Sequence, residues 1–248
     1  MVAARKLQRR SARDREGAFL VEGRVVVGEL LASELEVTDL FVASGSDLGE
    51  LVAAAEAAGV RVAEVPESVV ALLADTRTPQ GVVAVARLPA SSIPDHATLV
   101  VGLADVRDPG NAGTLVRTAY AAGADAVVFG PGAVDPFNAK TLRAASGAAF
   151  HVPVIRGVAL ETVLELLSRR GIRTVGTAAS ASVRYDEVDL TAPVAFVLGN
   201  EAWGIAAELG AHLDENVSIP MPGPMESLNV ATAGAILLFE AVRQRMRV

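Results

Sequence analysis

Residues 98–123 read TLVVGLADVRDPGNAGTLVRTAYAAG and contain one complete strand–turn–helix unit. The apolar run Thr98–Leu103 predicts a buried strand. A Pro-Gly turn follows, and we expect a helix from about Ala112 to Ala122 that is closed by Gly123. Continuous apolar strands that alternate with helices are typical of a parallel sheet covered on both faces.

The same alternation continues through the rest of the C-terminal part. Strands are predicted at Ala126–Phe129, Val152–Ile155, Ile172–Gly176 and Val194–Leu198, with a short extended segment at Val217–Pro220. Helices are predicted at Pro136–Ala145, Leu160–Arg170 and Asn229–Arg245. The last helix is almost wholly apolar or small over Val230–Phe239, so it must be buried, either in its own domain or at a dimer interface.

A smaller α/β block precedes this region. Strands are predicted at Phe19–Glu22, Val37–Val42, Val60–Val65 and Val82–Arg87, and helices at Arg24–Ser33, Leu48–Ala58 and Glu67–Leu73. Residues 88–96 (LPASSIPDH) are polar, carry two prolines and have the composition of a linker. We therefore predict two α/β domains, residues 1–90 and residues 97–248.

The composition narrows the class of protein. With 248 residues, 51% hydrophobic and 21% charged, the chain is expected to be globular. It has no cysteine, which excludes disulfides and thiolate-bound metals, and its three histidines lie too far apart in sequence to indicate a metal site. It has neither a long apolar run nor a signal-peptide pattern. We expect a cytoplasmic protein with no membrane and no metal partner.

The charge is uneven along the chain. The net charge is −7, yet residues 1–15 carry a local +5, which leaves −12 on the remainder. Such a basic arm on an acidic body can bind a polyanion locally, although a solvated helix end would have the same composition. The basic side chains of this arm are those of Arg5, Lys6, Arg9, Arg10, Arg13 and Arg15.

Three polar segments follow predicted strands, where ligands of parallel sheets bind. In residues 105–117 the free amides of the helix start would suit an anion, with Asn111 at the cap and Arg117 less than two turns further on. Residues 196–204 (FVLGNEAWG) end a strand in Gly199, which permits close approach to a ligand. Residues 219–231 (IPMPGPMESLNVA) form a rigid loop before the last helix.

Each of these segments also has an ordinary structural interpretation. Asn111, Ser227 or Asn229 could be simple helix caps, and Glu201 could be the acidic residue of a helix start. The glycine fingerprint of dinucleotide-binding folds and the phosphate loop of NTPases are both absent, which argues against an oxidoreductase or an NTPase. The reaction type does not follow from any one segment.

Taken together, the segments resemble the motifs of the SpoU/TrmH family of RNA ribose 2′-O-methyltransferases, in the SPOUT superfamily. Residues 111–117 (NAGTLVR) resemble the first motif and residues 198–201 (LGNE) the second. Residues 219–221 (IPM) with residues 226–231 (ESLNVA) resemble the third. Residues 17–23 (GAFLVEG) also resemble the start of the small RNA-substrate-binding domain that some members carry.

The resemblance implies properties that the pattern of strands does not. It implies a small N-terminal α/β RNA-binding domain and a C-terminal SPOUT α/β domain, with a parallel sheet and a deep trefoil knot. It implies S-adenosylmethionine as methyl donor, a homodimer with its active site at the interface, and methylation of a ribose 2′-hydroxyl in structured RNA. The two-domain layout favours ribosomal RNA over transfer RNA.

The resemblance also assigns roles to residues. In the family this arginine is often described as the base. Because a guanidinium stays protonated, we expect Arg117 instead to bind the target phosphate and stabilise the 2′-oxyanion. Asn111 would orient the ribose, and Glu201 would orient a loop or balance Arg117. The pocket would be completed by Ser227 and Asn229. The predicted cofactor-binding residues are Thr177, Ala178, Leu198, Gly199, Asn200, Ile219, Met221, Ser227, Leu228, Asn229 and Ala231. The predicted RNA-binding residues are Arg5, Lys6, Arg9, Arg10 and Arg13.

The main alternative is a non-catalytic RNA-binding protein on the same fold. The intact polar residues of all three motifs argue against it. A resistance methyltransferase, which protects the cell's own RNA, would share the chemistry and differ only in its biological role.

Overall fold

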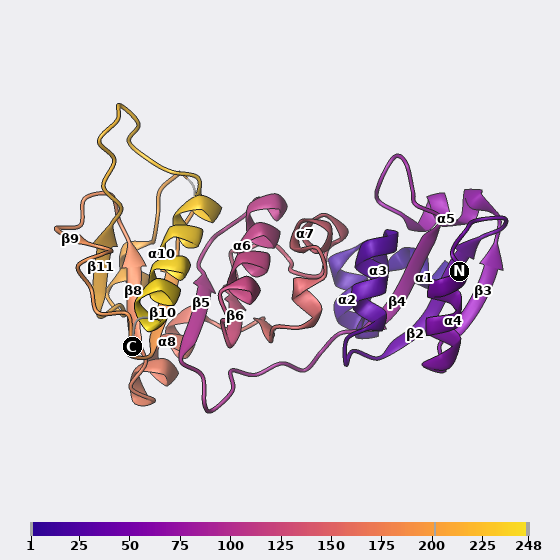
Figure 1. Cartoon of the computed structure of the whole chain (residues 1–248), viewed down its shortest axis with the longest axis horizontal. Helices are drawn as coiled ribbons and strands as arrows, with labels where there is room; N and C mark the ends of the chain where they lie inside the picture. Colours follow the sequence, from indigo (N-terminus) through magenta and orange to yellow (C-terminus); the bar gives the residue numbers. More distant parts are fainter. Residues whose placement is uncertain (1, 201, 247–248) are drawn as a thin grey trace. The chain divides into compact units, whose positions relative to one another are not determined.

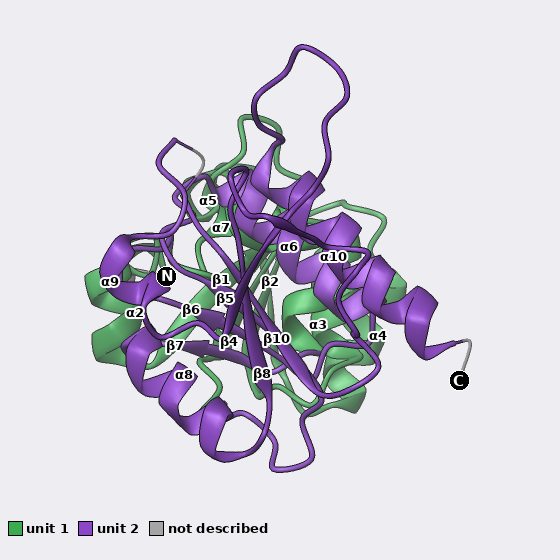
Figure 2. Cartoon of the chain, turned by 90° about the vertical axis from the view of Figure 1, so that its left-hand side faces the viewer, with its two compact units in different colours: residues 1–90, 135–151 green, residues 91–134, 152–248 purple. Residues whose placement is uncertain are grey.

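The structure is a computed structural model that describes residues 2–200 and 202–246. The chain divides into two compact units (Figure 2). Unit 1 comprises residues 1–90 and 135–151, and unit 2 comprises residues 91–134 and 152–248. Both are built of strands and helices, which confirms the predicted α/β class. Within the described ranges, no helix is long and apolar enough to cross a membrane.

Unit 2 is built on a seven-stranded sheet in which every neighbouring pair is parallel (Figure 1). Its central strands are buried along their whole length, as their continuous apolar sequences predict. The strands, in spatial order, are β7 (Val154–Arg156), β6 (Ala126–Phe129), β5 (Leu99–Leu103), β10 (Val194–Leu198), β8 (Arg173–Thr177), β11 (Glu215–Ser218) and β9 (Val183–Arg184).

Helices cover both faces of this sheet (Figure 2). On one face, α8 (Leu160–Arg169) packs its apolar side against Val197 of β10 and its neighbours. On the other, α6 (Pro109–Ala121) and α10 (Val230–Arg245) pack against each other, α6 against β6 and α10 against β10. The two helices approach closely at Gly234, where a Cβ would lie 2.4 Å from Cδ2 of Leu115.

Unit 1 contains a four-stranded mixed sheet in the order β1-β4-β2-β3. The pair β2/β3 is parallel, and the other two pairs are antiparallel. The strands are β1 (Ala18–Glu22), β4 (Val82–Arg87), β2 (Val37–Ala43) and β3 (Arg61–Val65). Three helices connect them, namely α3 (Arg24–Leu31), α4 (Gly49–Ala57) and α5 (Glu67–Leu73).

The basic N-terminal segment is folded rather than an extended arm. It forms two short helices, α1 (Val2–Lys6) and α2 (Arg10–Glu16), which the periodicity did not indicate. Leu7 and Ala12 are buried, and the Gln8 side chain donates to the carbonyl of Leu72 at 3.1 Å near the end of α5. The segment is therefore part of the core of unit 1.

Unit 1 also takes in residues 135–151, which the sequence analysis placed in the second domain. These residues contain α7 (Ala139–Ala145) and the 3₁₀ turn η1 (Ala148–Phe150). The ring centroids of Phe137 and Phe19 lie 4.8 Å apart. A segment from the middle of the chain thus completes the core of the N-terminal unit.

Candidate functional site

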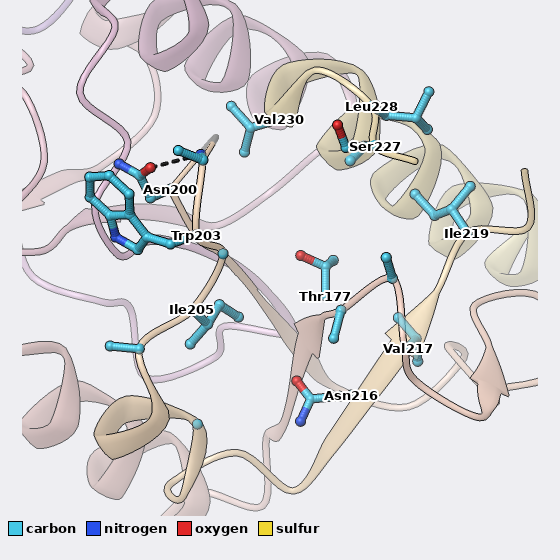
Figure 3. Close-up of a pocket in the computed structure, with 18 of the residues that line it drawn as sticks. Thr177, Asn200, Trp203, Ile205, Asn216, Val217, Ile219, Ser227, Leu228 and Val230 are labelled. Carbon is cyan, nitrogen blue, oxygen red and sulfur yellow. Dashed lines mark hydrogen bonds between the residues drawn. The ribbon is translucent and has the colours of Figure 1, made fainter. Parts of the chain in front are cut away.

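A pocket of about 590 Å³ opens in unit 2 at the carboxyl ends of β8, β10 and β11 (Figure 3). This is the edge of a parallel sheet where ligands usually bind, and the volume is in the range of small-molecule sites. The residues that line it are Thr177, Ala178, Ala179, Gly199, Asn200, Ala202, Trp203, Gly204, Ile205, Ala206, Ala207, Gly210, Asn216, Val217, Ile219, Met221, Ser227, Leu228, Val230 and Ala233.

The lining fits an uncharged, partly apolar ligand group. None of the described lining residues carries a charge, and polar side-chain atoms come from Thr177, Asn200, Trp203, Asn216 and Ser227. The strand ends and loops supply backbone N–H and C=O groups, which can bind a purine and a ribose. A neutral, partly apolar lining suits the adenosine part of a ligand better than a chain of phosphates. The pocket is therefore compatible with S-adenosylmethionine.

One wall of the pocket is a tight turn after β10. The amide of Asn200 donates to the Gly204 carbonyl at 2.8 Å, and the amide of Gly204 donates back at 3.0 Å. A Cβ at Gly199 would lie only 2.3 Å from the carbonyl carbon of Gly204. We expected this glycine to allow close approach of a ligand, but the structure shows that it is the turn's own backbone that approaches.

The side chain of Asn200 holds this turn against the loop after β5. Its Nδ2 donates to the backbone oxygen of Asp105 at 2.9 Å and to the carboxylate at 3.3 Å, while its Oδ1 accepts from the Ala202 amide at 2.8 Å. Asn200 is 8% exposed. Two polar segments that are far apart in sequence are thereby joined beside the pocket.

Two asparagines join the first and third motif segments. Asn229 caps α10, because its Oδ1 accepts from the amides of Ala231 at 2.9 Å and Thr232 at 3.2 Å. Its Nδ2 donates to Oδ1 of Asn111 at 2.9 Å. Asn229 is thus both the cap that the sequence allowed and part of a polar pair that links α10 to α6.

The prediction that Asn111 caps α6 was wrong. The cap is Asp108, whose side chain accepts from the Asn111 amide at 2.8 Å, and Pro109 occupies the first helical position. The helix therefore begins three residues earlier than expected. This places Asn111 within the first turn, where its side chain can turn toward α10.

Arg117 lies six residues further along α6, a rise of about 9 Å. It is exposed and makes no hydrogen bond or ion pair with the residues that the structure describes. Its guanidinium is therefore available to an anion. Ser227 is also exposed and lines the pocket, and the predicted site residue Glu201 lies outside the described residues.

The structure brings most of the predicted cofactor-binding residues together. Leu198, Asn229 and Ala231 do not line the pocket: Leu198 is fully buried in β10, and Ala231 is buried in the first turn of α10. The predicted residues that do line it are Thr177, Ala178, Gly199, Asn200, Ile219, Met221, Ser227 and Leu228. Ile205 and Asn216 also line the pocket but were not predicted, since neither belongs to a recognisable motif.

The predicted RNA-binding residues divide into two groups. Arg5, Lys6, Arg9 and Arg10 are exposed on unit 1. Arg13 is 5% exposed; its guanidinium donates to the Asp135 carboxylate at 2.5 Å and to the Leu7 carbonyl at 2.8 Å. A buried guanidinium with these partners is not available to a phosphate. Among residues 2–200 and 202–246, no cluster of acidic or histidine side chains could hold a metal ion.

The N-terminal and C-terminal parts of the chain match two different protein families. Residues 98–239 match the SpoU rRNA Methylase family, and residues 2–84 match the MRM3-like substrate binding domain. The chain is 37% identical to the 23S rRNA (guanosine(2553)-2′-O)-methyltransferase RlmP of Bacillus subtilis, over 95% of this chain and 92% of that protein.

Solved structures of similar proteins contain the expected methyl donor. An AdoMet-bound rRNA methyltransferase from Sinorhizobium meliloti is 33% identical and superposes with a TM-score of 0.87, over 98% of this chain and 93% of the other. The SpoU methyltransferase AviRb from Streptomyces viridochromogenes, also in complex with AdoMet, is 29% identical with a TM-score of 0.89, over 99% and 97%.

Proposed function

The chain belongs to the SpoU rRNA methylase family, and from this membership we propose that it methylates a ribose 2′-hydroxyl of ribosomal RNA. It is an S-adenosylmethionine-dependent RNA methyltransferase. The single observation that supports this function best is the pocket at the ends of β8, β10 and β11, whose described lining residues carry no charge, with the Asn111–Asn229 pair that joins the first and third motifs.

We propose that the pocket residues hold the methyl donor mainly through backbone groups. Thr177 and Ala178 would contribute from the end of β8, Gly199 and Asn200 from the turn after β10, and the others from residues 219–228. The bound donor supplies an activated methyl group, so the chain itself needs to position the ribose and stabilise charge. The predicted trefoil knot would lie in these C-terminal loops.

Arg117 is the proposed catalytic residue. As a permanently protonated, exposed guanidinium, it can bind the phosphate next to the target ribose and stabilise negative charge on the 2′-oxygen. The hydroxyl proton would pass to phosphate or water. Asn111, held by Asn229, would orient the ribose, and Ser227 would complete the wall of the pocket. Glu201 remains part of this prediction.

We further propose that the protein is a homodimer. Tyr120 of α6 is 47% exposed and Phe239 of α10 is 49% exposed, although both belong to helices that pack against each other. Large apolar side chains on one helical layer are typical of an interface between subunits. We expect a cytoplasmic enzyme, because that is where such an RNA substrate is made.

Unit 1 would bind the RNA substrate. Its exposed cations on α1 and around α2 can neutralise phosphates, while the remainder of the chain is acidic, so the contact should be local. The match to a substrate-binding domain supports this role. The proposed set is Arg5, Lys6, Arg9 and Arg10; Arg13 is left out because its charge is buried with Asp135.

The test is transfer of labelled methyl from S-adenosylmethionine to an unmodified 23S rRNA transcript, followed by mapping of the modified nucleotide. We expect one 2′-O-methylated ribose with the wild-type protein. Arg117→Ala should lower kcat by roughly 100-fold or more, the loss expected for one group that stabilises an oxyanion, with binding of the donor unchanged. Arg117→Lys should recover only part of the activity, because it cannot bind phosphate in a bidentate manner.

Two results would contradict the proposal. Methylation of a base rather than a ribose would exclude the proposed reaction. Donor binding without methylation of any ribosomal or transfer RNA would favour the non-catalytic alternative. Methylation of transfer RNA alone would keep the chemistry and overturn the proposed substrate.

A further inference from the structure

Trp203 is the only tryptophan of the chain, and it is strongly exposed. It lies in the turn after β10, and its residue is 61% exposed although the indole is the largest apolar side chain available to a core. Figure 3 shows the indole at the edge of the pocket, pointing away from Thr177 and Asn216. Trp203 is one of the residues that line the pocket, and its ring lies at the pocket's edge.

Arg107 covers one face of this ring. Its guanidinium carbon lies 5.1 Å from the centroid of the indole, within the distance of a cation–π contact. Its side chain is 62% exposed. Because one face of the ring carries the guanidinium and the residue is still 61% exposed, a large part of the indole remains accessible to a second planar group.

The pair is held in place by Asp105. Its Oδ1 accepts from Nε of Arg107 at 2.9 Å, and its backbone oxygen and Oδ2 accept from Nδ2 of Asn200 in the same turn as Trp203. A Cβ at Gly132 would lie 2.6 Å from Oδ1 of Asp105, so the carboxylate is also confined from that side. Asp105 thus contacts both Arg107 and the turn that carries Trp203.

We propose that Arg107 and Trp203 form a binding platform for one unpaired nucleotide of the RNA substrate. The base would stack on the open part of the indole, and the adjoining phosphate would bind the terminal nitrogens of Arg107. An aromatic ring beside a guanidinium is the combination that single-stranded RNA requires, because every base has a π-face and every nucleotide has a phosphate. This inference rests on the proposed function and adds the kind of RNA that the site accepts.

The position of the platform explains why it would be useful. It lies beside the pocket for the methyl donor, on the loops that follow β5 and β10, and Arg117 belongs to the helix that follows the same β5 loop. A nucleotide stacked here would be unpaired and splayed from its neighbours. The target ribose would therefore have to lie in a loop, bulge or single strand, not in a regular helix.

The first test compares kinetic constants with an unmodified 23S rRNA transcript. We expect Trp203→Ala to raise KM for the RNA roughly tenfold, the effect of losing one stacked base, and to raise it by a larger factor than KM for S-adenosylmethionine. Trp203→Phe should recover most of the loss, since it keeps an aromatic face. Arg107→Ala should weaken RNA binding. It should also reduce the slope of log affinity against log salt concentration by about one, the value for one lost phosphate contact.

The matched control for Arg107 is Arg169→Ala, which removes an exposed arginine from α8 on the other face of the sheet. It should leave both the RNA affinity and its salt dependence as in the wild type. Calorimetric titration with S-adenosylmethionine checks that each variant keeps a folded donor pocket.

The second test uses tryptophan emission, which reports on Trp203 alone. Titration with a single-stranded uridine oligonucleotide should quench the emission, and a fully paired RNA duplex should not. Loss of S-adenosylmethionine binding in Trp203→Phe would show that the indole belongs to the donor site and would overturn the proposal. An unchanged RNA KM in Trp203→Ala would do the same. Failure of the wild-type protein to methylate any RNA would instead count against the proposed function.

Discussion

Asn229 has two roles, because it caps α10 and also contacts Asn111 of the site. Its side-chain oxygen accepts from two amides of α10, and its nitrogen donates to Asn111. We expect Asn229→Ala to lower the free energy of unfolding by about 1 kcal/mol, the usual cost of a lost N-cap. It should also weaken binding of S-adenosylmethionine, because the neighbouring Ser227, Leu228 and Val230 line the pocket. Urea denaturation and calorimetry measure the two effects.

Asn229→Asp separates the two roles. A carboxylate still accepts from the helix amides and is favourable at a helix N-terminus, but it cannot donate to Asn111. We expect near-normal stability and donor affinity with a reduced rate of RNA methylation. A normal rate in this variant would show that the Asn111–Asn229 contact is structural only.

Arg13 and Asp135 form a buried ion pair that the sequence did not indicate. Both side chains are 6% exposed. Removal of one partner leaves an uncompensated buried charge, so Arg13→Ala should cost about 3 kcal/mol. The control is Arg9→Ala at an exposed position, which should change stability by less than about 0.5 kcal/mol. Denaturation with hydrogen exchange should locate the loss in unit 1; equal effects of the two variants would contradict the assignment.

For single residues, the sequence indicated which polar side chains belong to the site, but not which of them are buried or paired. The motifs pointed to Arg117, Ser227 and Asn229, and the structure shows all three to be exposed. The composition of the N-terminal segment could not show that Arg13 differs from Arg9. That difference depends on Asp135, which lies 122 residues away, and on burial that only the folded chain defines.

The strands were predictable because they are continuous apolar runs. Val194–Leu198 was predicted with its observed bounds, and most other elements differ by one or two residues. The start of α6 was missed, since Asp108 and Pro109 were taken as part of a turn although they form an N-cap and a first helical residue. The two-residue strand β9 and the four-residue helix α9 were not predicted, because they are too short to show a hydrophobic periodicity.

The end of α10 gives a prediction about pH. The hydrogen bonds from Arg243, at 2.7 and 2.5 Å, hold the pKa of Glu240 below its usual value. The stabilisation is therefore complete above the unfolded pKa of about 4.3 and is lost as the pH falls through the lower folded value. Glu240→Gln should flatten the decline of stability below about pH 4. Glu165→Gln, at an exposed position on α8, should leave the decline as in the wild type.

For the whole molecule, the main prediction concerns the subunit interface. Phe239→Asp places a charge on the exposed apolar face of α10. If that face joins two subunits, the variant should have the mass of one chain by light scattering and should lose most of its methyltransferase activity. Phe239→Leu, which stays apolar, should remain a dimer. A monomeric wild-type protein would refute the proposed homodimer.

The boundaries of the two compact units could be predicted only in part from the sequence. The linker composition indicated a boundary near residue 90, and the two compact units change over at that point. Nothing in residues 135–151 shows which sheet they pack on, because Phe137 and Phe150 would fit either apolar core. These residues belong to unit 1 because Phe137 and Phe150 contact Phe19, and no local sequence pattern predicts those contacts.

The membership of residues 135–151 in unit 1 has a consequence for synthesis and inheritance. Because strands β5 and β6 lie between the two parts of unit 1, a ribosome must release more than half of the chain before the first unit can finish folding. The usual order, in which an N-terminal domain folds before the next is made, is therefore not open to this protein. By the same token, a genetic exchange at the linker would separate Phe19 from Phe137, so an N-terminal unit transferred alone would lack part of its own core.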